Sequence, residues 1–127
     1  MIVRPKTKPL RLHQLEALLN RIPDNHSKRK FIEEDYAKQT AGYKGERSLE
    51  YHLSYLPEKD YYIFHDLRLY AGKHYFQIDI LILTPFFLSI LEVKNISGSL
   101  YFNPIFTQMV RTIEDKEEGF PDPVKQV

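Results

Sequence analysis

The 127-residue sequence contains no cysteine. The chain can therefore form neither a disulfide nor a thiolate metal site, and this absence weakly indicates a reducing compartment. The N-terminal residues 1–6 lack the apolar core of a signal peptide. The longest apolar stretch, residues 78–93, is interrupted by Asp79, Pro85 and Glu92, which excludes a membrane span. We expect a soluble cytoplasmic protein without a membrane partner.

The sequence also has almost no net charge, since its formal value is +1, but the two signs are unevenly distributed. Basic residues outnumber acidic ones in residues 1–30, which contain Arg4, Lys6, Lys8, Arg11, Arg21, Lys28, Arg29 and Lys30. The basic end is able to contact phosphates, although such a run is more often a solvated helix face. Hydrophobic residues make up 43% of the chain and charged residues 28%, which is typical of one globular domain.

The apolar periodicity changes from helical to alternating along the chain. The expected helices cover residues 10–22, a stretch that ends at Thr40 with either Asp24 or Ser27 as its cap, and residues 45–56. We expect Gly42 to end the second helix and Pro57 to stop the third. The expected strands cover residues 61–69, both sides of Thr84-Pro85 and part of 100–113, with tight turns at 71–73 and 95–98. This order predicts an α+β fold in which N-terminal helices pack on a mixed, largely antiparallel β-sheet.

The two strands around Thr84-Pro85 carry charges where a buried strand should have none. Because side chains alternate along a strand, Glu92 and Lys94 should project from one face. An antiparallel pairing places Asp79 opposite Ile90 and diagonal to Glu92, so two carboxylates and an ammonium would converge. Burying such charges is costly unless they pair or hold a metal. The alternative is a hairpin whose charges face solvent, with Lys94 as a cross-strand partner.

The third expected helix carries a carboxylate on its apolar stripe. Glu46 lies one turn before Leu49, on the stripe that continues through Leu53 and Leu56. An acidic residue on a buried face needs a partner. Alternatively, Glu46 needs no partner and is only a first-turn carboxylate, which interacts favourably with the positive N-terminal end of the helix.

Several short blocks resemble the nuclease-related domain (NERD) family of the PD-(D/E)XK nuclease superfamily. They are residues 41–46 (Ala-Gly-Tyr-Lys-Gly-Glu), 65–67 (His-Asp-Leu), 77–79 (Gln-Ile-Asp), 91–95 (Leu-Glu-Val-Lys-Asn), Gly98, and Asp122-Pro123 with Gln126. The resemblance covers residues 36–127 and implies a restriction-endonuclease-like core. It implies Glu46, Asp79, Glu92 and Lys94 at the nuclease positions, with Gln77 and Gln126 in support.

The resemblance also divides the chain into an N-terminal helical extension, residues 1–35, and a NERD-like core, residues 36–127. A late helix should begin with Asp122 as its cap and Pro123 in its first turn. Since that helix would be cut short, we expect a core truncated at its C-terminal end and further domains beyond residue 127.

The chemistry of the four site residues suits phosphodiester hydrolysis. Asp79 and Glu92 offer the oxygen ligands that Mg²⁺ prefers, and Mn²⁺ could replace it. Lys94 would orient the attacking water or stabilise developing charge, Glu46 would position a metal-bound water or bind the metal, and Gln77 would support them.

Three functions therefore remain open. The first is a Mg²⁺-dependent nuclease domain acting on nucleic acid, DNA being the expected substrate, with a homodimer possible. The second is a catalytically weak nucleic-acid-binding or regulatory module on the same fold. The third is an interaction domain in which Asp79, Glu92 and Lys94 form a structural ion network.

Overall fold

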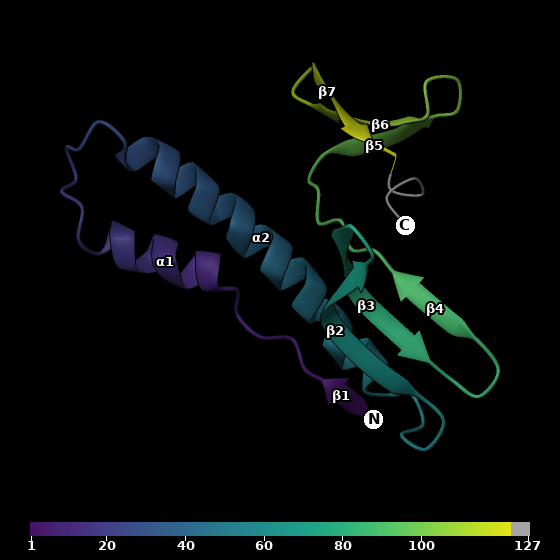
Figure 1. Ribbon diagram of the computed structural model, residues 1–127. Coiled ribbons are helices and arrows are strands. Elements are labelled where there is room, and N and C mark those ends of the chain that lie inside the picture. The colour runs from purple at the N-terminus through teal and green to yellow at the C-terminus, as the bar shows by residue number, and fades with distance from the viewer. Residues whose placement is uncertain (123–127) are drawn as a thin grey trace.

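Two helices and two β-sheets make up the computed structural model, which describes residues 1–122 (Figure 1). The helices are α1 (Leu10–Leu19) and α2 (Arg29–Leu53). The first sheet has the order β1-β2-β3-β4, formed by Ile2–Arg4, Tyr62–Ala71, His74–Leu83 and Leu88–Leu91. The second has the order β5-β6-β7, formed by Ser99–Asn103, Gln108–Ile113 and Lys116–Pro121.

The α+β class and the mixed, largely antiparallel pairing are confirmed. Strand β1 runs parallel to β2, and every other pair of neighbouring strands is antiparallel. The strands after residue 98 form a second sheet of their own, which the sequence pattern did not separate from the first. Neither of the described helices is long and apolar enough to span a membrane.

Helix α2 replaces the two separate helices expected on either side of Gly42. It runs without interruption through Gly42 and Gly45, and ends at Leu53 rather than Leu56. A glycine inside a helix costs about 1 kcal/mol relative to alanine, which tertiary packing readily outweighs. Here the C-terminal half of the helix packs on the first sheet, and the N-terminal half packs on α1 (Figure 1).

Helix α1 ends at Leu19, one turn earlier than its apolar pattern predicts. Leu12 and Leu15 are buried, and an ion pair at 2.6 Å joins Arg11 to Asp35 of α2. Because α2 runs through residues 35 and 36, one helix carries both the contact with α1 and the contact with the sheet. The division into an extension and a core at that point stays a prediction.

The core under the first sheet follows the predicted leucine stripe. Leu53 of α2 packs against Ile63 of β2 and against Ile80 and Ile82 of β3, and Leu49 and Leu56 lie around them. The exposed fractions of Ile63 and Ile80 are 1% and 0%. The leucines of α2 therefore determine which side of the helix faces the sheet, and Glu46 lies on that side.

The register of β3 against β4 differs by two residues from the expected one. Leu83 pairs with Leu88 and Ile80 with Leu91, so the loop spans Thr84 to Phe87. The Thr84 hydroxyl accepts hydrogen bonds from the backbone N–H groups of Phe86 and Phe87, at 3.2 and 2.9 Å. A threonine that bonds its own loop in this way favours the longer turn. Continued beyond β4, this register brings Glu92, not Ile90, opposite Asp79.

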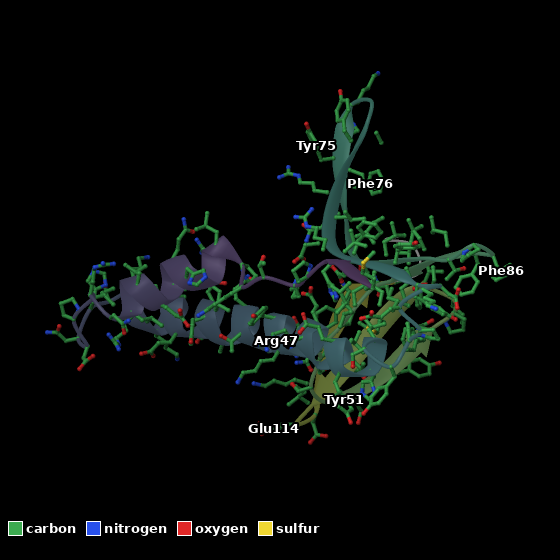
Figure 2. The ribbon with its side chains drawn as sticks, turned by 90° about the horizontal axis from the view of Figure 1, so that it is seen from below. Arg47, Tyr51, Tyr75, Phe76, Phe86 and Glu114 are labelled. Atoms are coloured by element: carbon green, nitrogen blue, oxygen red, sulfur yellow. The ribbon has the colours of Figure 1, made fainter. Side chains whose placement is uncertain are left out.

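The far half of the β2–β3 hairpin projects from the rest of the molecule and carries exposed aromatic side chains (Figure 2). The rings of Tyr70 and Tyr75 lie 5.0 Å apart, and the Arg68 guanidinium lies 4.9 Å from the centre of the Tyr75 ring. Gly72 has a φ of 72°, which the predicted turn at this tip requires.

Residues 92–97, which follow β4, form a connection without regular secondary structure and with a bend at Gly98, not the tight turn expected at 95–98. It leads into the second sheet, whose last strand β7 was not predicted. The expected late helix is not tested, because Pro123 and Gln126 lie outside the described residues, and Asp122 follows β7 without regular structure.

Candidate active site

Asp79 of β3 is held against the segment that follows β4. Its Oδ2 accepts a hydrogen bond from the backbone N–H of Val93 at 3.0 Å. Burial raises the pKa of Asp79, and the charge of Glu92 raises it further, against the lowering effect of the Val93 hydrogen bond. The carboxylates of Asp79 and Glu92 therefore lie close enough to repel each other in a partly dry environment.

Glu92 and Lys94 project together, as alternation along an extended chain predicts. Lys94 Nζ lies 2.5 Å from Glu92 Oε1, and their side chains are 37% and 22% exposed. The charge of Lys94 also acts on Asp79, whose pKa it lowers. The structure thus brings together the three groups expected to converge, although through a register different from the predicted one. An exposed ion pair between Glu92 and Lys94 contributes little to stability by itself.

Glu46 faces the same region from α2, and its partner is a lysine from the N-terminal segment. Lys6 Nζ forms ion pairs with Glu46 and, at 2.7 Å, with Asp66 of β2. The pKa of Glu46 lies above its ordinary value: burial raises it most, the hydrogen bond and charge of Lys6 lower it, and the charges of Asp79 and Asp66 raise it further. Burial lowers the pKa of Lys6, but the hydrogen bonds to Asp66 and Glu46 and the charges of these two carboxylates together leave the pKa above its ordinary value.

Asp66 and Lys6 were not assigned a role from sequence. Asp66 has a φ of 52° and interrupts the β2–β3 ladder between the pairs His65–Ile80 and Leu67–Ile78. By that register it lies opposite Asp79. A charged residue inside a strand was the available signal for Asp66, whereas nothing near Lys6 indicates a contact forty residues away.

The remaining candidates lie around this cluster. Gln77 is exposed on β3, two residues before Asp79, and pairs in the ladder with Arg68. Gln126 lies outside the described residues. His65 is fully buried, its ring nitrogens have no hydrogen-bond partner among residues 1–122, and burial lowers its pKa.

The carboxylates suit a hydrated divalent cation better than an all-protein metal cage. Within residues 1–122, no three histidine, aspartate or glutamate side chains gather in a way that could hold a metal ion. Asp79 and Glu92 nevertheless provide two neighbouring carboxylates, and Mg²⁺ commonly takes one or two and keeps several waters. A cation between them would relieve the repulsion that raises the pKa of Asp79. The donor set therefore fits such an ion.

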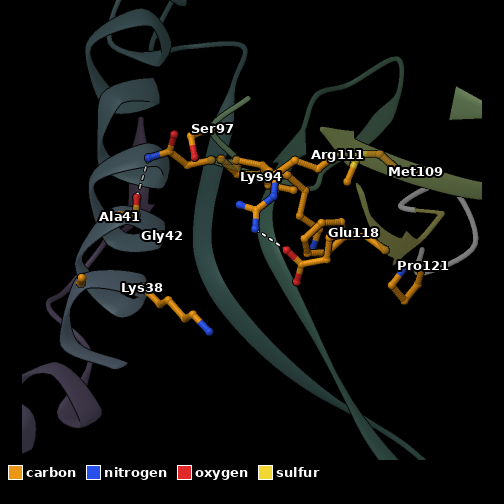
Figure 3. A pocket seen from close by; sticks show the side chains of 14 residues that line it. Lys38, Ala41, Gly42, Lys94, Ser97, Met109, Arg111, Glu118 and Pro121 are labelled. Carbon is orange, nitrogen blue, oxygen red and sulfur yellow. Dashed lines mark hydrogen bonds and ion pairs between the residues drawn. The ribbon is translucent and has the colours of Figure 1, made fainter. Parts of the chain in front are cut away.

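A groove of about 650 Å³ opens beside these residues, between α2 and the second sheet (Figure 3). Residues 93–97 line one part of it, and the Asn95 side chain donates a 2.7 Å hydrogen bond to the Ala41 carbonyl of α2. The charged lining residues are Lys38, Lys94, Arg111 and Glu118. Glu118 pairs with Arg111, so the lining has an excess of positive charge.

Comparison with known proteins gives one match. The family model of the nuclease-related domain matches residues 41–127, which include Glu46, Asp66, Asp79, Glu92 and Lys94 but not Lys6. No curated protein and no solved structure matches the chain. The matched region is more than half of the sequence and carries the carboxylates and Lys94 described above, so the chain belongs to the nuclease-related domain family.

Proposed function

We propose that this protein is a Mg²⁺-dependent nuclease domain that hydrolyses phosphodiester bonds in DNA. The observation that carries the proposal is the hydrogen bond from Val93 N–H to Asp79, which holds a half-buried carboxylate beside the Glu92–Lys94 pair. Family membership supports a nuclease-related function and, in general, dependence on a divalent metal.

Each residue has a distinct role in this proposal. Asp79 and Glu92 hold the cation, which when bound polarises the scissile phosphate and its water ligand. Lys94 orients the attacking water and stabilises charge that develops on the phosphate. Its contact with Glu92 at 2.5 Å keeps the ammonium beside the carboxylates. Glu46 positions the water from α2, and Gln77 and Gln126 support the site.

The groove supports nucleic acid as the substrate. Lys94 belongs both to the carboxylate cluster and to the groove lining, so a strand in the groove would pass the reacting groups. Cationic side chains in a groove attract the phosphate backbone whatever the base sequence. Lys38 and Arg111 lie on opposite sides of this groove, on α2 and β6.

A second candidate is a nucleic-acid-binding module on the same fold with weak or lost catalysis. The observation that favours it is that Glu46 already pairs with Lys6 and that no three-ligand metal site forms within residues 1–122. Such a module would bind nucleic acid in the groove and leave it intact.

The test is incubation with labelled single- and double-stranded DNA and RNA in Mg²⁺ or Mn²⁺. We expect cleavage by the wild type, and a loss of about 100-fold or more in Asp79→Asn and Lys94→Ala. Lys59→Ala is the matched control, because Lys59 is exposed in the loop before β2. Thermal unfolding checks that each variant folds.

Cleavage that persists in both site variants would contradict the assignment. Binding of DNA without cleavage under any metal would select the second candidate. The proposal also includes a cytoplasmic location and an optional homodimer, which fractionation and analytical ultracentrifugation test.

A further inference from the structure

A lysine from outside the matched family region is buried among the carboxylates of the candidate site. Lys6 lies on the segment between β1 and α1, and its side chain is only 2% exposed. Its ammonium contacts both Glu46 and Asp66. Lys8, two residues later, pairs with Glu16 and is 29% exposed, as an ordinary surface lysine is. The segment thus inserts one particular ammonium into the site.

The charges around Lys6 leave room for one divalent cation. Four carboxylates interact through their charges. Those of Asp66 and Asp79 raise the pKa of Glu46, and that of Glu92 raises the pKa of Asp79. Against these four carboxylates stand two ammonium groups, Lys6 and Lys94. Two negative charges remain, which one Mg²⁺ would neutralise. Without the ammonium of Lys6, three negative charges would remain.

The position of the ammonium is that of a cation bridging two carboxylates. Partly buried carboxylates such as Glu46 and Asp66, whose side chains are 18% and 24% exposed, require a positive partner. In two-metal nucleases a second divalent ion meets this need. Here the covalently attached ammonium of Lys6 meets it.

We propose that Lys6 takes the place of a second metal ion, so that the site binds a single divalent cation at Asp79 and Glu92. Lys6 is a positioning residue: it holds Glu46 and Asp66 and keeps Glu46 away from direct metal coordination. This inference rests on the proposed function, because it assumes the cation at Asp79 and Glu92.

The test is a titration of the full chain with Mn²⁺, in which electron paramagnetic resonance measures free Mn²⁺. We expect one bound Mn²⁺ per wild-type chain and two in Lys6→Met, where the pair Glu46 and Asp66 is left without its cation. Lys6→Arg should restore one, because it returns the charge. Lys8→Met is the matched control from the same segment and should bind one.

Two results would overturn the role of Lys6. One is a folded Lys6→Met variant with the stoichiometry and affinity of the wild type. The other is a wild type that binds two Mn²⁺, which decides the question even if Lys6→Met fails to fold. The proposed function fails separately, if the wild-type Mn²⁺ site survives Asp79→Asn. In that case the single cation at Asp79 and Glu92 fails with it, whereas a gain of one site in Lys6→Met would still show that Lys6 holds Glu46 and Asp66 in place of a cation.

Discussion

The two glycines inside α2 allow a sharp test of how the site is attached to the helix. At Gly42 an added Cβ would meet no atom within 4 Å. At Gly45 it would lie 2.5 Å from Asn95 Cβ and 3.1 Å from Asn95 Cγ. The same change, glycine to alanine, should therefore have opposite effects at positions three residues apart in one helix.

The magnitudes follow from helix propensity and from the contact. Replacing a glycine inside a helix by alanine stabilises by about 1 kcal/mol, which is the expected result for Gly42→Ala. Carbon atoms in contact normally lie about 3.5–4.0 Å apart, so Gly45→Ala must move Asn95 by about 1 Å or more. Such overpacking costs about 1–3 kcal/mol. Gly45→Ala should accordingly be less stable than Gly42→Ala by about 1–3 kcal/mol.

Urea unfolding followed by circular dichroism measures both variants. Asn95→Gly removes the Cβ that the new methyl group would meet, so it should relieve the cost of Gly45→Ala in a double-mutant cycle. Since Asn95 directly follows Lys94, Gly45→Ala should also reduce cleavage. If Gly45→Ala stabilises the protein as much as Gly42→Ala does, the close approach of Asn95 to the helix is refuted.

Three further predictions concern the core, the buried histidine and the groove. Leu53→Ala should lower the free energy of unfolding by about 2–5 kcal/mol in urea, because Leu53 is 8% exposed in the core. Burial lowers the pKa of His65 below its ordinary value of 6.5, while Glu50 and Asp66 raise it and Lys6 lowers it further. The folded state thus binds fewer protons at this group, so stability should fall as the pH drops below about 6.5, and His65→Leu should remove that part of the dependence in pH-resolved melts. Arg111→Ala should weaken DNA binding and reduce its salt dependence by about one phosphate contact in fluorescence anisotropy, whereas Arg21→Ala, beyond the end of α1, should not.

Local patterns were enough to predict the elements that lie around the site. The leucines of α2 recur at helical spacing, and their burial against Ile63 and Ile80 confirms that stripe. The alternation around Thr84 predicted an antiparallel pair, and the same alternation put Glu92 and Lys94 on one side, where they form an ion pair. These features depend on residues close together in the chain, whose geometry the backbone dictates.

The elements that were predicted wrongly depend on tertiary packing or strand pairing that overrides the local sequence preference. Gly42 and Gly45 are weak helix formers, and only packing at both ends of α2 decides that the helix continues. Strand β7 has few apolar residues and follows a turn at Glu114 and Asp115, whose φ angles of 46° and 64° carry no glycine signal. Pairing with β6 makes it a strand.

The sequence by itself determined the α+β class, the amphipathic helices, the β3–β4 pair and the candidate acids and lysine, because periodicity and charge are local properties. Only the tertiary structure decided that β3 and β4 pair two residues away from the expected register, and that Asn95 packs on Gly45. It also decided that Lys6 reaches Glu46 and Asp66. The physical reason is that the burial of a charge depends on everything packed around it, and residues 6, 46 and 66 meet only when the whole chain has folded.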